Sequence, residues 1–318
     1  MSGYESLHFQ SVSFTGMEAG TRLIVLGAVH GNETCGTQAI RRVVGEIESG
    51  QFVVRAGSVT FVPVTNPLAY AKHQRMGDRN LNRNLVPTDT PLEFEDRIAN
   101  WLCPLLAQHD VLLDLHSFHT AGQPFAMLGP EDNSGTLEPF SRSGEETALA
   151  LRLGVHRFVD GWLDTYATGV KRRLAAGVSA READVSYGVG TTEYMRARGG
   201  IALTLECGQH DDPAAPEVAY RAIHNTLAHL QLTASAAPAR VSTTEALRLY
   251  EVIDRAHPDD EFARTWASFD PVKAGEVIGT RHSGEMVTAK QDGYIVFPNP
   301  KALPGQEWFY LARPSTRV

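Results

Sequence analysis

The chain has 318 residues, of which 42% are hydrophobic and 21% charged, and its formal net charge is −8 from 37 acidic and 29 basic residues. These values are typical of a globular protein with one large domain and a small one, or with two domains. They argue against a nucleic-acid-binding protein, because no excess of basic residues offsets the repulsion from phosphate. The three cysteines, Cys35, Cys103 and Cys207, form no closely spaced pair, which favours a reducing compartment.

The N-terminal segment, residues 1–16, has neither a basic region nor an apolar core and does not resemble a signal peptide. No apolar run in the chain approaches the ~20 residues needed to span a bilayer. We therefore expect a cytoplasmic protein without a membrane partner.

Up to about residue 232, short apolar runs alternate with amphipathic segments. The runs predict buried strands at residues 22–28, 58–64, 111–115, 125–128 and 201–205. The amphipathic segments predict helices at residues 37–49, 91–108, 144–154 and 216–232, the second kinked or broken at Pro104. Most strands are apolar throughout, which is typical of a sheet covered on both faces. This order predicts an α/β fold with a mixed, largely parallel sheet flanked by helices.

After residue 232 the sequence changes character. Residues 233–240 are small and polar and include a proline, as in a linker. The segment beyond predicts short strands at residues 250–255, 276–280, 285–289 and 294–297. The pair Asp292–Gly293 predicts a two-residue hairpin turn. The least regular stretch, residues 165–200, predicts helical pieces joined by long loops.

Two stretches place metal-binding side chains directly after predicted strands. In GAVHGNETCG, residues 27–36, His30 and Glu33 lie three apart among glycines, and in LLDLHSF His116 ends another apolar run. Open α/β sheets bind ligands beyond the carboxyl ends of their strands, so these side chains can meet. Two imidazoles and a carboxylate are the ligands of a catalytic zinc with an open fourth position. Asp114, on the same side of the strand as His116, is suited to hold the second N–H of that histidine.

A third apolar run, in IALTLECGQH, ends at Glu206. An unpaired carboxylate costs several kcal/mol to bury, so Glu206 is exposed, salt-bridged or functional. Beside a metal it could take a proton from water and pass it to a leaving amine. We interpret the adjacent Cys207 as a small buried residue, because its spacing implies no histidine partner.

Residues 65–85, TNPLAYAKHQRMGDRNLNRNL, follow a predicted strand and are rich in arginine and asparagine. Guanidinium groups bind carboxylates through two parallel hydrogen bonds, and neighbouring asparagines add oriented donors. An arginine near a metal could also stabilise an oxyanion. The alternative is a solvated basic loop without a binding role.

Taken together, these stretches resemble the succinylglutamate desuccinylase/aspartoacylase family of zinc amidohydrolases, which is related to the carboxypeptidase A type of zinc peptidase. The resemblance covers most of the chain and rests on the order and spacing of short motifs. These are GAVHGNE (27–33), NP (66–67), Arg75 with NLNR (80–83), DLHS (114–117), TLECG (204–208) and DGYIVFPNP (292–300).

The resemblance implies a zinc carboxypeptidase-like α/β catalytic domain, residues 1–235, followed by a small all-β domain, residues 236–318, that caps the active site. It implies that one zinc ion per chain is held by His30, Glu33 and His116.

It further implies that Glu206 is the general base and later the acid, and that Arg75 polarises the scissile carbonyl. It assigns substrate binding to Asn82 and Arg83. Of the two arginines at positions 196 and 198, we favour Arg196 as a further substrate-binding residue. The family usually reads Asp-Leu-Asn-Arg where this chain has NLNR, so Asn80 removes a negative charge beside the pocket.

The implied function is that of a metal-dependent hydrolase acting on linear amide, non-peptide C–N bonds. It would deacylate an N-acyl amino acid, similar to N-succinylglutamate or N-acetylaspartate, by Glu206-assisted attack of zinc-bound water. The products are a carboxylic acid and a free amino acid, which places the protein in amino-acid metabolism. The expected partner is this small molecule, without nucleic acid or membrane, and a homo-oligomer stays open.

Three alternatives remain at this point. A zinc carboxypeptidase acting on short peptides would use the same centre, a non-catalytic metal-binding protein would keep the ligands, and a hydrolase using Cys207 would need no metal. The residues also leave open the acyl group and the amino acid, including neutral and basic ones. The native metal, among zinc, cobalt and manganese, is equally open.

Overall fold

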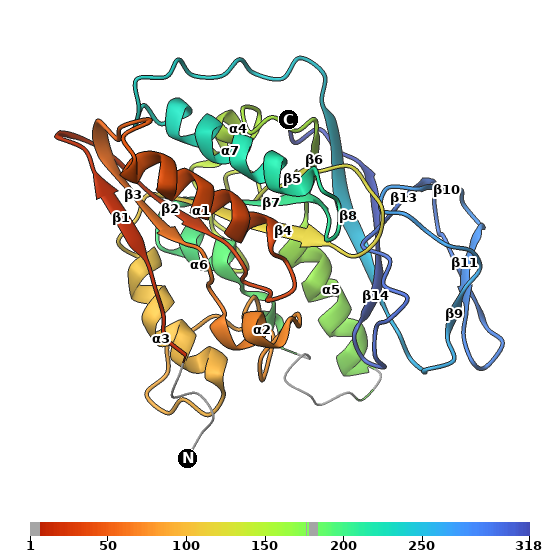
Figure 1. The fold of residues 1–318 in the computed structure, drawn as a ribbon. Coiled ribbons are helices and arrows are strands. Elements are labelled where there is room, and N and C mark those ends of the chain that lie inside the picture. The colour runs from red at the N-terminus through yellow and green to blue at the C-terminus, as the bar shows by residue number, and fades with distance from the viewer. Residues whose placement is uncertain (1–6, 176, 178–183) are drawn as a thin grey trace.

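The computed structural model describes residues 7–175, 177 and 184–318. The prediction about a signal peptide falls partly on residues 1–6, which lie outside the described residues. Figure 1 shows a large twisted sheet with helices on both of its faces, extended at one end by the C-terminal strands.

The predicted strands and helices are all present, with shifted boundaries, and several short elements are added. The strands before residue 232 are β1 (Val12–Thr15), β2 (Glu18–Leu26), β3 (Ala56–Val62), β4 (Val111–Phe118), β5 (Phe125–Met127), β6 (Arg157–Asp160) and β7 (Ile201–Gln209). The helices are α1 (Cys35–Glu48), α2 (Pro67–Lys72), α3 (Phe94–Leu106), α4 (Ser143–Ala150), α5 (Trp162–Ala175), α6 (Thr191–Ala197) and α7 (Ala215–His229), with the 3₁₀ turn η2 (Val185–Gly188). The later strands are β8 (Glu245–Asp254), β9 (Glu261–Phe262), β10 (Pro271–Val272), β11 (Val277–Thr280), β12 (Met286–Thr288), β13 (Gly293–Val296) and β14 (Glu307–Pro314).

The main sheet has the order β1-β3-β2-β4-β7-β5-β6-β8-β14-β13-β10. Strands β3, β2, β4 and β7 run parallel, as do β5, β6 and β8, whereas β5 is antiparallel to β7. The mixed, largely parallel sheet predicted from the sequence is therefore confirmed. Its parallel pairs bring the carboxyl ends of β2, β4 and β7 to one edge, where ligands bind in open α/β sheets.

Successive residues of β2 explain why its sequence is apolar throughout. Leu23 and Val25 join a core that includes side chains of α1 and α7, whereas Ile24 and Leu26 join a core that includes side chains of α3 and α6. Because neighbouring side chains of a strand point to opposite faces, a sheet covered on both sides needs apolar residues at every position.

The sequence predicts a kink or a break at Pro104. Helix α3 continues through Pro104 to Leu106, so a break is wrong, while a kink stays a prediction. Pro104 lies in the last turn of the helix, where the loss of one backbone N–H affects few remaining hydrogen bonds. The irregular stretch at residues 165–200 contains the end of α5, η2 and α6, which confirms helical pieces, while residues 176 and 178–183 lie outside the described residues.

The predicted hairpin turn at Asp292–Gly293 is wrong. Gly293 lies in β13 and pairs with Val272 of β10, while β12 belongs to a separate sheet of order β12-β11-β9. The Asp292 carboxylate instead accepts hydrogen bonds from Lys273 and from the backbone N–H of Ala274, which ties it to another loop. The hairpin turn of this region joins β11 to β12, with Gly284 in the left-handed region at φ +86°.

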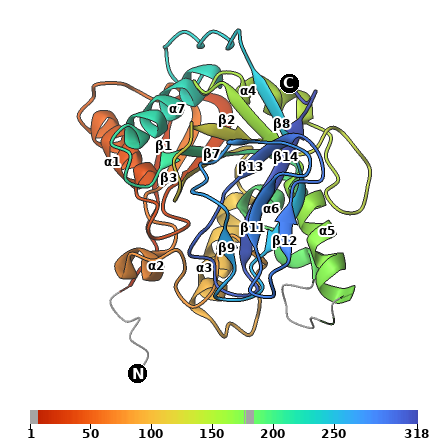
Figure 2. The same cartoon turned by 90° about the vertical axis from the view of Figure 1, so that its right-hand side faces the viewer.

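Residues 230–244, which include the predicted linker, contain neither helix nor strand. Strand β8 follows and pairs with β6, so the C-terminal strands continue the main sheet. Figure 2 looks onto these strands, with the small sheet of β9, β11 and β12 toward the viewer. The division into residues 1–235 and 236–318 stays a prediction.

A buried carboxylate, Asp260, joins two loops of the C-terminal segment. It accepts hydrogen bonds from the backbone N–H groups of Ala256, His257 and His282 and from the guanidinium of Arg281 at 2.8 Å. Burial alone would raise the pKa of Asp260, but these donors lower it well below its usual range.

We predict that Asp260→Asn lowers the free energy of unfolding at pH 7 by about 2–3 kcal/mol, because an amide cannot replace a carboxylate that accepts from four donors. A lowered pKa stabilises the fold above the unfolded-state value of ~3.9, and that stabilisation is lost as pH falls through the folded-state pKa. Urea unfolding should therefore show a difference between wild type and variant that shrinks in acid. Equal stability at pH 7 would contradict this role.

Candidate active site

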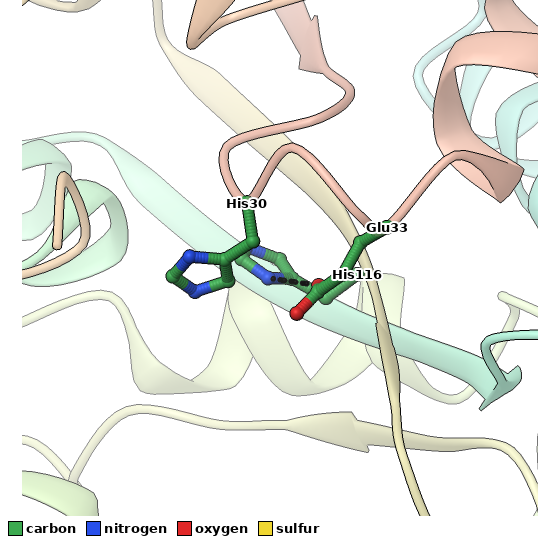
Figure 3. Close-up of side chains that lie close together, drawn as sticks. All are labelled: His30, Glu33 and His116. Carbon is green, nitrogen blue, oxygen red and sulfur yellow. Dashed lines mark hydrogen bonds and ion pairs between the residues drawn. The ribbon is translucent and has the colours of Figure 1, made fainter. Parts of the chain in front are cut away.

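The three predicted metal ligands meet at the carboxyl ends of β2 and β4. His30 and Glu33 lie in the turn between β2 and α1, and His116 lies near the end of β4. One ligand atom of each lies within 4.8 Å of the others, and all three side chains are buried. Figure 3 shows Glu33 and His116 joined by a hydrogen bond, with the ring of His30 beside them.

Glycine lets the turn after β2 pass against the start of α2. A Cβ on Gly31 would lie 2.0 Å from the backbone carbonyl carbon of Ala69, so no larger residue fits without movement of the backbone. Ala28, with φ +47°, presents its carbonyl to the backbone N–H of Asn66 at 3.0 Å. These contacts fix the turn and, with it, the two side chains that it carries.

Glu33 is the central acceptor of the site. Its Oε2 accepts from Nδ1 of His116 at 3.0 Å and from the backbone N–H of Ser117 at 3.1 Å, and its Oε1 accepts from Arg75 at 2.9 Å. Burial alone would raise the pKa of Glu33, but the neighbouring His30, His116 and Arg75 lower it well below its usual range. Glu33 is therefore a carboxylate at neutral pH.

The partners of the two histidines define their free nitrogens. Nδ1 of His30 lies 3.2 Å from the carbonyl oxygen of Arg75, which can only accept, so Nδ1 carries the proton and Nε2 the lone pair. Burial and the charge of Arg75 lower the pKa of His30 well below its usual range, which keeps it neutral. Nε2 of His116 lies 2.9 Å from Oδ2 of Asp114, the arrangement expected for a carboxylate that orients a metal ligand.

Glu206 lies next to His116 because β4 and β7 are paired in parallel with these two residues opposite each other. It is buried, and its Oε2 has no hydrogen-bond partner among the described residues. Burial raises the pKa of Glu206 to about 8, against the charges of His116 and Arg75, which lower it. A carboxyl group with such a pKa can both accept and donate a proton near neutral pH.

A single cavity contains most of the predicted site. Beside His30, His116 and Glu206, the predicted residues that line it are Arg75, Asn82, Arg83 and Arg196. Residues from the C-terminal strands and their loops form part of its wall, namely Phe297, Asn299, Glu307 and Tyr310.

Asn82 and Arg83 lie in the cavity with partners of their own. Oδ1 of Asn82 accepts from the backbone N–H of Thr191 at 2.9 Å. The Arg83 guanidinium lies 4.6 Å from the centre of the Trp162 ring and donates to Glu307 at 3.3 Å. A substrate carboxylate that binds Arg83 would therefore either share the guanidinium with Glu307 or displace Glu307 from it.

Arg196 is buried and lines the cavity, but the structure pairs it with several acceptors. It donates to Glu146 at 2.8 Å, to Glu138 at 2.9 Å and to the carbonyl oxygen of Ala202 at 2.7 Å. Arg198, the other residue considered, does not line this cavity and stacks on Tyr194. A substrate-binding role for Arg196 stays a prediction.

Several residues of the cavity were not predicted from the sequence. They include His119, Trp162, Glu193, Glu307 and Tyr310. Only Glu307 has a pattern that could have pointed to the site. It is a carboxylate at the start of the apolar run EWFYLA, just as Glu206 is a carboxylate at the end of the apolar run IALTL. The other residues have no distinguishing pattern, because the fold brings them together from separate elements.

Cys207 is buried, and its thiol donates to the carbonyl oxygen of Leu205. Burial raises the pKa of this thiol well above its usual range. Since the nucleophile is the thiolate, this environment favours a packing role over a catalytic one.

The sequence and the fold both resemble known proteins. The family model of the succinylglutamate desuccinylase/aspartoacylase catalytic domain matches residues 19–133, which include His30, Glu33 and His116. The succinylglutamate desuccinylase of Vibrio cholerae serotype O1 (strain O395) is 27% identical over 300 residues, covering 91% of this chain and 80% of that protein. In sequence, the chain is thus similar to the succinylglutamate desuccinylase/aspartoacylase family. Members of this family are hydrolases that act on N-acyl amide bonds.

Solved structures of the family share the fold. A succinylglutamate desuccinylase/aspartoacylase from Rhodobacter sphaeroides has a TM-score of 0.72 at 18% identity, covering 98% of this chain and 91% of that one. The product-bound ectoine utilization protein EutE (DoeB) from Ruegeria pomeroyi has a TM-score of 0.69 at 17% identity, covering 95% and 88%. Over the described residues, no helix combines the length and apolar character that crossing a membrane requires.

The close contact of Gly31 with α2 predicts that no larger residue is tolerated in the turn that carries His30 and Glu33. Gly31→Ala should lower the free energy of unfolding and weaken binding of divalent metal, because the added Cβ displaces the turn. Gly45→Ala is the matched control, since nothing lies within 4 Å of the Cβ at this exposed position of α1. The control should gain about 0.5–1 kcal/mol of stability with unchanged metal binding. Thermal unfolding and metal titration measure both, and a Gly31→Ala protein as stable as wild type would contradict the argument.

Proposed function

We propose that this protein is a zinc-dependent amidohydrolase that removes the acyl group from a small N-acyl amino acid. The observation that carries the proposal is the convergence of His30, Glu33 and His116 in one cavity with Glu206 directly beside them. Similarity to a family of N-acyl amide hydrolases supports the same reaction class.

The residues present fit a divalent transition metal. The donor set consists of the imidazoles of His30 and His116 and the carboxylate of Glu33, and His30 offers the lone pair of its Nε2. Nδ1 of His116, which faces Glu33, would be the second nitrogen ligand, while Nε2 keeps its contact with Asp114. When bound, zinc supplies Lewis acidity, which polarises a carbonyl and lowers the pKa of water towards ~7.

The chain itself supplies proton transfer and orientation. Oε2 of Glu206, which has no hydrogen-bond partner in the described structure, takes the proton of the attacking water and returns it to the departing amine nitrogen. The Arg75 guanidinium, 41% exposed and adjacent to Glu33, donates to the oxygen on which negative charge develops. Asn82 and Arg83 bind the carboxylate of the amino-acid part, and Arg196 stays a further candidate.

The wall of the cavity favours a small substrate. Phe297, Glu307 and Tyr310 come from the C-terminal segment and close one side, which is the capping role proposed for residues 236–318. A zinc carboxypeptidase acting on short peptides would need room for a longer chain on this side. The names of the relatives support N-succinylglutamate as one candidate, with N-acetylaspartate the other.

We predict that Glu206→Gln lowers kcat by about 10²–10⁴-fold, the usual contribution of a general acid–base residue. The amide is isosteric but cannot carry the proton, so zinc should remain at one ion per chain. Primary-amine release from N-succinyl and N-acetyl amino acids measures the rate, and metal analysis measures the zinc.

His116→Ala is the matched comparison, because it should lose both zinc and activity. Wild-type turnover by Glu206→Gln would show that another group is the base. Zinc binding without hydrolysis of any N-acyl amino acid or short peptide by wild type would favour a non-catalytic metal-binding protein.

A chelator should abolish hydrolysis, and one equivalent of zinc should restore it. Cobalt and manganese test the choice of metal in the same assay, since affinity alone does not decide which ion a site holds. Activity that survives complete metal removal but is lost on thiol alkylation would instead support Cys207.

A further inference from the structure

Three exposed side chains of the C-terminal segment form a second cluster of metal-binding groups. His257 and Asp259 lie in the loop between β8 and β9, and His282 lies in the turn between β11 and β12. One ligand atom of each lies within 4.8 Å of the others. None of the three lines the cavity of His116 and Glu206, so the cluster is separate from the candidate active site.

The distances within the cluster match those between ligands of one metal ion. Oδ2 of Asp259 lies 3.3 Å from Nδ1 of His282 and 3.5 Å from Nδ1 of His257. Two atoms that bind one zinc ion at about 2.0–2.1 Å with tetrahedral angles are themselves about 3.3–3.4 Å apart. Both observed distances are longer than the usual N–H···O hydrogen bond of about 2.7–3.2 Å, so the carboxylate does not hold the rings by ordinary hydrogen bonds.

The geometry of the β8–β9 loop leaves a lone pair on Nδ1 of His257. The backbone N–H of Asp259 points to this nitrogen at 3.2 Å, so the nitrogen accepts and cannot donate to the Asp259 carboxylate. A nitrogen lone pair and a carboxylate oxygen therefore face each other, which is favourable only with a cation between them. Among the residues that the structure describes, Asp259 pairs with the two histidines and with no lysine or arginine.

Asp260 fixes the backbone that carries the two rings. The backbone N–H groups of His257 and His282 both donate to its carboxylate, at 3.1 and 2.9 Å. The ring centres lie 4.0 Å apart, with the ring planes inclined by 20°. Because the rings are exposed, a rotation that opens the stack lets both face one ion. The backbone is already in place, so binding costs little conformational freedom.

We propose that His257, Asp259 and His282 bind a divalent transition metal ion, which joins the β8–β9 loop to the turn between β11 and β12. Two imidazoles and one carboxylate favour zinc, cobalt, nickel or copper over magnesium and calcium, which prefer oxygen ligands. Water completes the coordination, since the cluster is exposed. Three exposed ligands hold an ion less tightly than a buried site, so this ion is removed by dialysis against metal-free buffer and returns as free metal rises. Its binding stabilises the folded chain.

The test counts the metal ions bound by wild type and by His282→Ala. Full-length protein is equilibrated by dialysis at micromolar free zinc, and we expect wild type to hold one ion per chain more than the variant. The candidate active site has the same residues in both proteins, so this difference is independent of its loading. His282→Ala should fold like wild type, because its backbone N–H still donates to Asp260. His8→Ala, at an exposed position before β1, is the matched control and should bind as wild type does.

Asp259→Asn tests the carboxylate ligand. The variant keeps the size of the side chain and removes its charge, so the affinity for zinc should fall by about tenfold or more. Cobalt gives a second readout, because the visible absorption of bound Co²⁺ in wild type should exceed that in His282→Ala by the contribution of one ion. Zinc should also raise the midpoint of thermal unfolding further in wild type than in His282→Ala, whereas magnesium should shift both equally.

Each negative result overturns a stated part of the proposal. Equal numbers of bound zinc ions in wild type and His282→Ala would overturn the site. Unchanged affinity in Asp259→Asn would overturn the three-ligand arrangement. Equal zinc-dependent shifts of the unfolding midpoint would show that the ion does not join the two loops. None of these results depends on Glu206 or its reaction, so they are distinct from a failure of the proposed function.

Discussion

The buried carboxylate of Glu33 is the contact on which the arrangement of the site depends. It accepts from His116 and Ser117 at the end of β4 and from Arg75 in the loop after α2, so two separate segments converge on one side chain. Burying a carboxylate is costly unless it is paired and fully hydrogen-bonded, and here the partners are themselves the groups that the chemistry needs. The bonds from Ser117 and Arg75 leave Nδ1 of His116 free for a metal and keep Glu33 in place beside it.

Charge is distributed unevenly among the residues that line the cavity. Around His116, the carboxylates are balanced by Arg75 and by the dication that the donor set fits. Arg83 and Glu307 form an ion pair in the wall of the same cavity. Around Arg196, the acids outnumber the cation.

Much of the site could be predicted because its residues follow apolar strands in short motifs. His30, Glu33, His116 and Glu206 each mark a strand end, and parallel pairing brings such ends together whatever the loops do. The cavity wall could not be predicted in this way. Tyr310 lies in a strand with five successive buried residues, and its approach to the cavity depends on pairings between segments far apart in the chain. Likewise, the local Asp-Gly signal failed because β12 and β13, the strands on either side of it, belong to different sheets.

The pairing of β6 with β8 makes the cavity wall part of the same hydrogen-bonded sheet as the candidate ligands. A wall attached in this way cannot swing aside like a hinged lid, so a ligand must enter through an opening that already exists. It also means that the contacts of Glu307 and Tyr310 with a ligand are preset by backbone geometry, at little entropic cost on binding. Substitutions at these positions of β14 would then offer an evolutionary route to new ligands that leaves the turn after β2 untouched.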